Sequence, residues 1–480
     1  MFSLPIRNPF SVIPIRVSNF KPWIFGVREV LWTLNFMLLM SGGLMANSLL
    51  WDKTNSLVSC DLRGQRINVL LTNIAMATGW EVLVEPGTEL EISVKFDRLP
   101  VPEALERLLR GVNYALVGGT NGVTRLYVFK TSMAHATQPI VSTTNAGVER
   151  SWLRMETNRV PNELMVRVRP GVSIDEIAVK FGAQVIGRLD KYRVYRLRFN
   201  SVQDLEQLQE MLGTIDGVQS VDYNYQIPMP ESPLPVQAGM VSPILLKHRV
   251  DSSSLVIGLV DTSVQVPSEL QNLFLPSVDV LPARTEAETP THGTAMALTL
   301  LRALGIVTGG EASVKILPVN VFGESQMSTT FDVAAGIAAA VNNGAQIINL
   351  SLGTPVDSPV LKGVVEEVTR QGVVIVAAAG NEPTTVPVYP AAYSSVVAVT
   401  ALDPATGTVA PYANRGDFVD MAAPGISAVP YGGKVYVVVG TSPAAAYVTG
   451  LLAGLANKSG QSLSEVKEQV VKTATAILGK

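Results

Sequence analysis

Four polar residues in the C-terminal half of the chain have types and positions that suit acyl-transfer chemistry. Asp261 ends the apolar run LVIGLVD, His292 opens HGTAMALTLLRAL, Asn381 closes VVIVAAAGN, and Ser442 stands between YVVV and a long Ala/Leu run. A serine hydroxyl can attack a carbonyl carbon, an imidazole can take its proton and return it to the leaving amine, and a carboxylate can hold the imidazole's tautomer. The Asn381 amide could donate a hydrogen bond to the developing oxyanion. Together these residues predict catalysis of acyl transfer.

Each residue also has an ordinary structural alternative. Ser442 could be an N-cap, because a serine side chain readily accepts a hydrogen bond from the first turn of a helix, and Pro443 would suit the first helical position. Asp261 could form a turn before Thr262, and His292 could simply begin a helix. The nucleophile hypothesis for Ser442 rests on the partial positive charge and unpaired N–H donors of a helix N-terminus, which favour an oxyanion.

These residues fall at junctions between apolar runs and helical patterns over residues 251–480. Short runs rich in Val, Ile and Leu, such as VKILPVNVF, AQIINLSLG and SVVAVTAL, alternate with patterns such as FDVAAGIAAAVNNG and PVLKGVVEEVTRQG. Strands that are apolar on both faces and lie between helices predict a mainly parallel sheet covered on both sides. We expect a three-layer α/β sandwich with its reactive groups at the carboxyl ends of strands.

Composition restricts the class of protein and of partner. The length of 480 residues suggests about three domains, and a hydrophobic content of 47% is ample for packed cores. The net charge is −3, with 37 basic and 40 acidic residues and no dense basic block beyond the N-terminus, so no nucleic-acid partner is expected. The single cysteine, Cys60, excludes intrachain disulfides, and only three histidines argue against a zinc site, so we predict no metal site.

Residues 1–50 are predicted to be a signal peptide or a membrane anchor. Four basic residues precede an uncharged stretch over residues 30–51, and the small residues Ala46 and Ser48 offer a signal-peptidase site. About 20 apolar residues are also enough to span a bilayer, so the anchor stays an alternative. In both cases we expect export to the periplasm or cell envelope of a bacterium.

Residues 57–130 are predicted to form a small α+β module. Helical patterns over residues 67–79 and 101–117 flank the strand WEVLVE. The string DLRGQRINVLLTNIAMATGWEVLVEPGTELEISVKFDRLPVPEALERLLRG resembles the short N-terminal domain of secretins and TonB-dependent receptors. This resemblance implies a protein partner in the cell envelope. Residues 131–158, rich in Thr, Ser, Ala and Asn, are expected to be a linker.

Several blocks of residues 251–480 resemble, in order, the signature blocks of the subtilisin-like serine proteases, or subtilases. They are VIGLVDTS, HGT, ILPVNVF, AAGIAAAVNNGAQIINLSLG, VVIVAAAGN, YPAAYSSVVAVTA, MAAPG and GTSPAAAYVTG. The order Asp, His, Ser is also that of subtilisin. The resemblance implies that Asp261 orients the imidazole, His292 is the general base and acid, and Ser442 is the nucleophile. It implies further that Asn381 and the Ser442 backbone N–H bind the oxyanion.

The same resemblance implies the substrate-binding residues of a cleft. Ser351, Leu352 and Gly353 match the strand that pairs with an extended peptide substrate. The wall of the pocket for the side chain before the scissile bond is matched by Ala377, Ala378, Ala379 and Gly380.

The chain departs from the family pattern around two of these residues. Ser263 stands where the family usually has Gly after the carboxylate, and Pro443 stands where it has Met after the serine. The usual Pro-His pair is replaced by Ala446 and Tyr447. Because Pro443 fits a first helical turn and leaves the Ser442 N–H free, we expect catalysis to survive. No cofactor is identified; the resemblance allows structural calcium, although the loop LGIVTGGEAS lacks a cluster of carboxylates.

Residues 159–230 are predicted to form a second α+β unit in the order βαββαβ. Its helix SIDEIAVKFG has Ser173 as a cap and Gly182 as a stop. The unit resembles subtilase propeptides, which implies that its C-terminal tail, residues 221–230, lies in the cleft as a product-like inhibitor. Residues 231–250, with several prolines, are expected to be an exposed processing linker.

We therefore expect an exported serine endopeptidase, made as a zymogen, that hydrolyses peptides or proteins through an acyl-enzyme. The alternative is a catalytically silent subtilase-fold protein that binds or scaffolds in the cell envelope through residues 57–130; the altered surroundings of Asp261 and Ser442 support it. A third hypothesis is an enzyme that cleaves only itself. Contact with a membrane is expected only if the N-terminal apolar segment is not cleaved.

Overall fold

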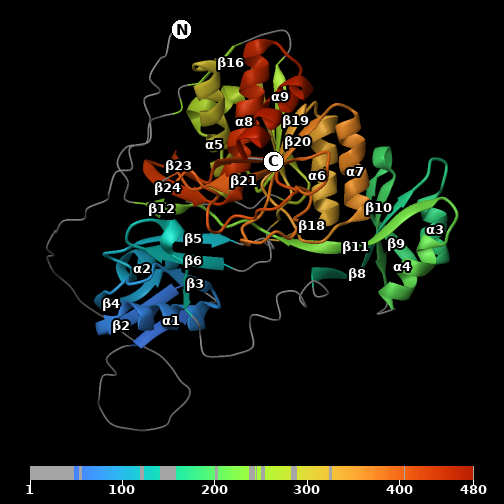
Figure 1. Ribbon diagram of the computed structural model, residues 1–480. Helices are drawn as coiled ribbons and strands as arrows, with labels where there is room; N and C mark the ends of the chain where they lie inside the picture. Colours follow the sequence, from blue (N-terminus) through green and yellow to red (C-terminus); the bar gives the residue numbers. More distant parts are fainter. Residues whose placement is uncertain are drawn as a thin grey trace.

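The computed structural model describes residues 48–52, 57–118, 124–140, 158–200, 204–236, 244, 246–249, 254–282, 289–323, 327–404 and 406–478. They form an N-terminal module (residues 48–140), a middle domain (residues 158–228) and a C-terminal domain (residues 254–478), as Figure 1 shows. The signal or anchor segment, apart from residues 48–50, and most of the linker 131–158 lie outside the described residues. Within the described part, no helix combines the length and apolarity needed to cross a membrane.

The C-terminal domain is built on a seven-stranded sheet in which every pairing is parallel. Leu259 and Val260 are neighbours in one strand, yet they belong to two different hydrophobic clusters, because successive side chains point to opposite faces of a sheet. In spatial order the strands are β15 (Val278–Asp279), β17 (Val314–Asn320), β14 (Leu255–Asp261), β19 (Ile347–Leu350), β20 (Val374–Ala378), β21 (Val397–Leu402) and β22 (Met421–Pro424).

Helices cover both faces of this sheet. The first hydrophobic cluster includes residues of α5 (His292–Thr308), α8 (Thr441–Ser459) and α9 (Leu463–Leu478). The second includes residues of α6 (Thr330–Asn342) and α7 (Pro359–Arg370). The predicted three-layer α/β sandwich with a mainly parallel sheet is thereby confirmed.

The strand before Ser442 does not belong to this parallel sheet. β24 (Lys434–Val439) leads into α8 and is the centre of an antiparallel sheet between β12 (Leu234–Val236) and β23 (Ile426–Tyr431). Ser442 therefore comes from a separate hairpin, whereas Asp261 lies at the carboxyl end of β14 as expected.

The middle domain has the predicted order of elements. It consists of β8 (Arg159–Val168), α3 (Ile174–Lys180), β9 (Ala183–Leu189), β10 (Val194–Phe199), α4 (Leu205–Gly213) and β11 (Val218–Pro228). Ser173 caps α3 as predicted, because its hydroxyl accepts a hydrogen bond from the Glu176 N–H at 3.3 Å. The antiparallel sheet continues onto the C-terminal domain, where β11 pairs with β18 (Met327–Thr329).

The N-terminal module contains two sheets and two helices. One sheet joins β1 (Ser48–Asp52), β2 (Leu57–Arg66) and β4 (Glu91–Pro100); the other has the order β5 (Asn113–Gly118), β6 (Thr124–Phe129), β3 (Glu81–Val84), β7 (Gln138–Ile140). The helices are α1 (Ile67–Thr78) and α2 (Val101–Leu108).

Three expectations about these segments are corrected. The helix predicted over residues 101–117 ends at Leu108 and is followed by β5, because Gly111 has a φ of +105° that breaks the helical path. The predicted linker 131–158 begins with ordered structure, since β7 pairs with β3. The predicted processing linker 231–250 is also partly paired: β12 joins β24, and β13 (Lys247–His248) joins β16 (Glu311–Ala312). Main-chain pairing needs no side-chain periodicity, so the sequence pattern did not reveal these short strands.

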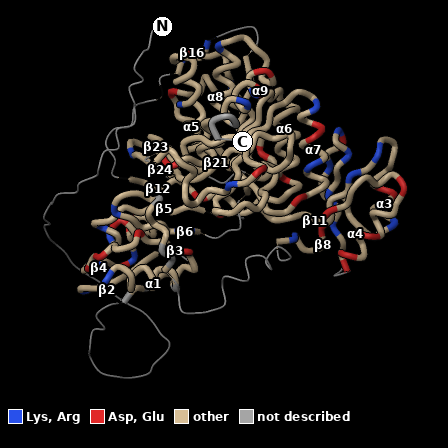
Figure 2. The backbone as a smooth tube through the Cα atoms, viewed as in Figure 1, with Lys and Arg blue, Asp and Glu red and all other residues tan. Residues whose placement is uncertain are grey.

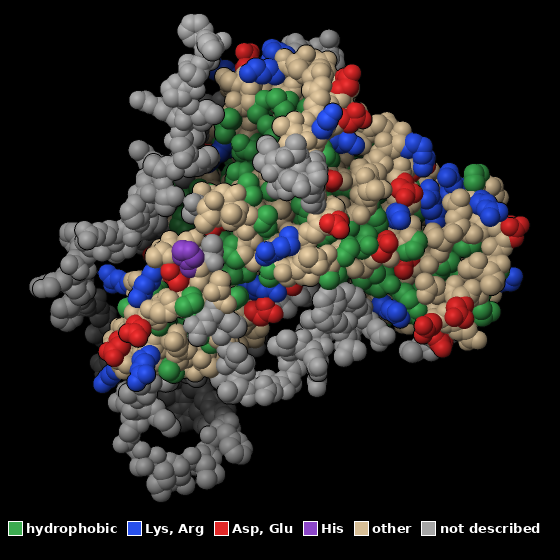
Figure 3. Space-filling model, viewed as in Figure 1, with side chains coloured by type: hydrophobic (Ala, Val, Ile, Leu, Met, Phe, Trp, Pro, Cys, Tyr) green, Lys and Arg blue, Asp and Glu red, His purple; other side chains and the backbone are tan. Residues whose placement is uncertain are grey.

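Charged residues of both signs are distributed over the molecule. Figure 2 shows basic and acidic positions interspersed along the backbone of the middle domain and the N-terminal module. Figure 3 shows the same mixture on the face in view.

Candidate active site

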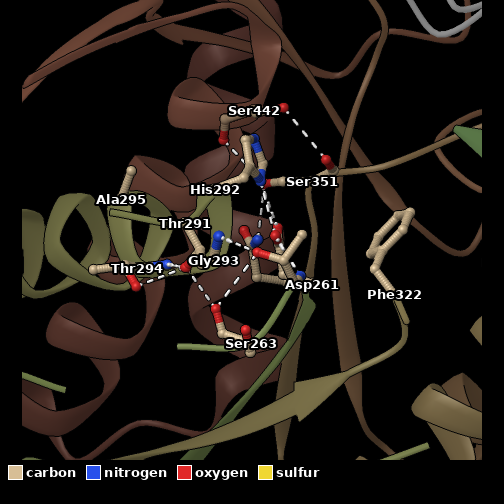
Figure 4. A network of polar contacts seen from close by, with 12 residues as sticks. Asp261, Ser263, Thr291, His292, Gly293, Thr294, Ala295, Phe322, Ser351 and Ser442 are labelled. Atoms are coloured by element: carbon tan, nitrogen blue, oxygen red, sulfur yellow. Dashed lines mark hydrogen bonds and ion pairs between the residues drawn. The ribbon is translucent and has the colours of Figure 1, made fainter. Parts of the chain in front are cut away.

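Asp261 and His292 form a buried pair at the centre of the site. His292 Nδ1 lies 2.8 Å from Asp261 Oδ1 and 3.0 Å from Oδ2 (Figure 4). The Thr262 N–H also donates to Asp261 Oδ1, at 2.7 Å. Asp261 is fully buried and His292 is 3% exposed. Because an ionised carboxylate only accepts hydrogen bonds, the proton of neutral His292 sits on Nδ1 and its Nε2 is left as the base.

Ser442 is the second residue of α8 and does not cap it. The N-cap is Gly440, without a side-chain hydrogen bond, so the N-cap alternative for Ser442 is wrong; Pro443 is the third helical residue, not the first. The Ser442 hydroxyl donates to the Ser351 carbonyl oxygen at 3.3 Å, and the Ser351 hydroxyl donates to the Ser442 carbonyl oxygen at 3.1 Å. Figure 4 shows Ser442 beside His292. The hydroxyl must exchange its bond to Ser351 for one to Nε2 before it can react.

The Asn381 amide makes two different hydrogen bonds. Its Oδ1 accepts from the Thr441 N–H at 2.9 Å, which ties it to the first turn of α8. Its Nδ2 donates at 2.9 Å to the carbonyl oxygen of Gly118, a residue of the N-terminal module. Gly440 has a φ of +147°, and a Cβ there would lie 2.9 Å from Nδ2, so the position requires glycine.

A cavity of about 350 Å³ joins these groups to most of the expected substrate-binding residues. Its lining includes His292, Asn381, Ser442, Ser351, Leu352, Gly353, Ala378 and Gly380. Ala377 and Ala379 are fully buried and are not among the residues that line it. The structure thus brings together the catalytic candidates and five of the seven binding candidates.

The segment between the middle and C-terminal domains crosses this cavity. β11 pairs antiparallel with β18 as far as Pro228, and β12 pairs antiparallel with β24 from Leu234. Between them Met229, Pro230, Glu231 and Ser232 line the same cavity as Ser442. The chain therefore lines the cavity beside the serine and is held by paired strands on both sides.

Hydrogen bonds from neighbouring residues hold His292 in place, and of these residues only Thr291 was not singled out by the sequence patterns. The Gly293 N–H donates to the Thr262 hydroxyl at 2.8 Å, and a Cβ at Gly293 would lie 2.3 Å from the Thr262 carbonyl oxygen. Thr291 caps α5 by accepting from the Thr294 N–H at 3.1 Å, and donates to the Ser263 carbonyl oxygen at 2.6 Å. The sequence signals for this support were the HGT block and the Thr-Ser pair that follows Asp261 in VIGLVDTS. Neither Thr262 nor Ser263 has a positive φ, so the loss of the family glycine brings no strain there.

The described residues contain no cluster of acidic side chains that could bind a calcium ion. No group of three or more His, Cys, Asp or Glu side chains comes together there. Calcium prefers six to eight oxygen ligands, with carboxylates prominent. The described residues therefore offer no carboxylate cluster for calcium, and no catalytic step involves the ion.

Family models and known proteins are similar to parts of this chain. Residues 252–479 match the family model described as the Subtilase family, and residues 156–224 match the fervidolysin N-terminal prodomain. Thermitase from Thermoactinomyces vulgaris is 36% identical over 191 residues, which cover 39% of this chain and 68% of thermitase. Subtilisin Savinase from Lederbergia lenta is 33% identical over 192 residues, which cover 39% of this chain and 71% of that protein. A thermophilic serine proteinase from Bacillus sp. (strain AK1) is 35% identical over 175 residues, but this chain spans only 43% of its length.

Two solved structures share the fold. Fervidolysin from Fervidobacterium pennivorans has a TM-score of 0.50 at 23% identity, covering 64% of this chain and 56% of that one. A mutant of the epidermin leader peptide processing serine protease from Staphylococcus aureus has a TM-score of 0.51 at 17% identity, covering 64% and 92%. With its matched family model, its relatives and its fold, the chain belongs to the subtilase family and carries a region similar to the fervidolysin prodomain.

Proposed function

We propose that this protein is a serine endopeptidase, made as a zymogen, that hydrolyses peptide bonds in peptides or proteins. The observation that carries the proposal is the buried Asp261–His292 pair beside Ser442 at the N-terminus of α8. Asn381 adds a side-chain donor on the same cavity.

Each residue has a role in the proposed reaction. The Ser442 oxygen attacks the substrate carbonyl carbon while His292 Nε2 takes the hydroxyl proton, and Asp261 stabilises the imidazolium that forms. Asn381 Nδ2 and the Ser442 N–H stabilise the oxyanion. The intermediate collapses as Nε2 gives its proton to the leaving amine, which departs and leaves an acyl-enzyme. In the second half of the reaction water attacks the acyl carbon while Nε2 takes its proton. The ester bond to Ser442 then breaks, Nε2 returns the proton to the Ser442 oxygen, and the carboxylic-acid product leaves.

The first substrate in this proposal is the chain itself. Residues 229–232 lie against the site with paired strands on both sides, which is the arrangement an uncut precursor needs. We expect the cut to fall between Met229 and Pro233, so that the C-terminal product begins at residues 230–233. The N-terminal product would then hold both the module and the middle domain.

The location of the protein is proposed from its sequence. The basic and apolar pattern of residues 1–50 supports export to the bacterial periplasm or envelope, with a membrane anchor if the segment is retained. An envelope partner for residues 57–130 is proposed on the resemblance alone. One experiment distinguishes the peptidase hypothesis from the alternative of a catalytically silent binding protein.

The test compares the unaltered chain with Ser442→Ala and with the control Ser464→Ala, a serine exposed on α9. Each chain is followed by intact mass, by labelling with a serine-directed fluorophosphonate, and by digestion of a peptide library. We expect cutting at residues 229–233, labelling and peptide hydrolysis in the unaltered chain and in Ser464→Ala, and none in Ser442→Ala. If all three chains stay whole, unlabelled and inactive, either an activator is missing or the silent binding protein replaces the enzyme.

A further inference from the structure

The sheet strands β5 and β6 of the N-terminal module are buried on both faces. Leu126 and Val128 pack in the module's own hydrophobic cluster, whereas Val117 and Tyr127 belong to the main cluster of the C-terminal domain. Figure 1 shows β5 and β6 lying next to β12 and β24. A strand that is apolar on both faces needs a second cover, and here the C-terminal domain provides it.

The contact between the two units is well packed. The Tyr127 and Tyr412 rings meet edge to face, with centroids 6.1 Å apart and an interplanar angle of 64°. Tyr412 is fully buried, and Tyr436 and Val438 of β24 belong to the same cluster. An edge-to-face pair of this kind stabilises the contact beyond the burial of its apolar surface. The module is therefore docked by a hydrophobic surface, beside the strand that leads to Ser442.

A buried arginine fixes the orientation of this docking. The Arg125 side chain is 8% exposed, and its Nε lies 2.5 Å from Oε2 of Glu81, the cross-strand neighbour of Arg125 in β3. Its Nη2 lies 3.1 Å from Glu382 Oε2 of the C-terminal domain, and its Nη1 donates a hydrogen bond to the Asn381 carbonyl oxygen. Burial acts to lower the pKa of Arg125, but the carboxylates of Glu382 and Glu81 outweigh it and raise the pKa. A buried charge of this kind is stable only while both partners stay in place.

The docked module reaches the oxyanion donor. The Gly118 carbonyl oxygen, at the end of β5, accepts the hydrogen bond of Asn381 Nδ2 at 2.9 Å. The next strand also touches the segment that crosses the cleft, because the Thr124 hydroxyl donates to Glu231 Oε1 at 2.5 Å. Asn381 Nδ2 carries two N–H groups, and the module engages one of them in place of a substrate oxygen.

We propose that the N-terminal module is a second inhibitor of the peptidase, separate from the prodomain-like middle domain, and that its partner is the cleft of its own chain. The middle domain holds residues 229–232 beside Ser442, while the Gly118 carbonyl oxygen of the module engages one N–H of Asn381 Nδ2 that the oxyanion needs. Self-cleavage then waits until the β5–β6 face leaves the C-terminal domain. This inference rests on the proposed peptidase function.

The test weakens the docking from two independent contacts and measures the rate of self-cleavage. Arg125→Glu places a carboxylate between Glu81 and Glu382, and Tyr127→Ala removes the ring that covers Tyr412. The control is Arg107→Glu, the same change of charge at an exposed position of α2. The half-life of each full-length chain is followed by intact mass, and fluorophosphonate labelling of Ser442 is measured before any cut appears. Thermal unfolding in a Ser442→Ala background reports whether each variant is folded.

We expect Arg125→Glu and Tyr127→Ala to shorten the half-life roughly tenfold or more and to label faster, because each loses a buried contact that holds the module. Arg107→Glu should match the unaltered chain. If both variants, folded, cleave at the unaltered rate or more slowly, the module does not inhibit and the inference is overturned, although the peptidase stands. If one variant is unfolded, the other decides; if both are, the module is a required part of the fold and not an inhibitor. If no chain cleaves or labels, the proposed function itself fails.

Discussion

Removing the Asn381 amide has two opposite effects on self-cleavage, and the structure lets them be compared. Asn381→Ala deletes Nδ2, which is proposed to bind the oxyanion and now holds the Gly118 carbonyl oxygen at 2.9 Å. It also deletes Oδ1, the acceptor of the Thr441 N–H at 2.9 Å. The first loss slows the reaction and at the same time loosens the module; the second destabilises the start of α8.

The slowing effect is the larger one. Loss of one oxyanion donor lowers kcat about 10²- to 10³-fold, a range measured in subtilisin, a member of the same family. The hydrogen bond to Gly118 contributes about 0.5–1.5 kcal/mol, so its loss can accelerate undocking by about tenfold at most. We therefore expect self-cleavage of Asn381→Ala to be about 10- to 10³-fold slower. The buried Thr441 N–H, left without its acceptor, should lower the free energy of unfolding by about 1–3 kcal/mol.

The assay is the half-life of the full-length chain by intact mass, with stability measured by urea unfolding in a Ser442→Ala background. Asn343→Ala is a matched control, because this exposed amide also donates to a backbone carbonyl, that of Ala339 at 2.9 Å, but lies away from the site. It should cleave at the unaltered rate. A half-life of Asn381→Ala equal to or shorter than that of the unaltered chain would refute the assignment of Asn381 as oxyanion donor.

Two further predictions test the support of the site and its pH dependence. Gly293→Ala should lower activity at least tenfold and reduce the free energy of unfolding by about 1–3 kcal/mol, because its Cβ would lie 2.3 Å from the Thr262 carbonyl oxygen. Gly305→Ala in the same helix is the control: its Cβ would have no atom within 4 Å, so the change should be neutral or stabilising. Equal effects of the two substitutions on activity and thermal unfolding would contradict the reasoning. Burial raises the pKa of Asp222 from 3.8 to about 6, so between these values the folded precursor retains a proton that the unfolded chain releases. The free energy of unfolding should therefore fall as the pH rises from about 4 to about 7. Urea unfolding of the Ser442→Ala precursor at these two pH values measures the fall, and Asp222→Asn should remove it. An unchanged pH slope in Asp222→Asn would show that another group is responsible.

Local patterns were enough to predict most elements of the middle and C-terminal domains. The parallel strands are continuous apolar runs, and Ser173 stands at its predicted cap. The same patterns failed for residues 113–117, which were predicted to extend the preceding helix but belong to β5. They also failed for the short strands β7, β12 and β13. Those strands are stabilised by partners distant in sequence, and their own residues carry no clear period.

The family, the order of Asp261, His292 and Ser442, and the layered fold could all be inferred from the amino-acid sequence, because each depends on motifs and periodicities within short segments. The three-dimensional structure was needed to show that Ser442 follows a strand of a separate antiparallel sheet and that the Gly118 carbonyl oxygen accepts a hydrogen bond from Asn381, 263 residues away. Such a contact depends on how two independently folded surfaces fit together. No spacing within either segment encodes that fit, since it is set by the shape and charge of the assembled faces.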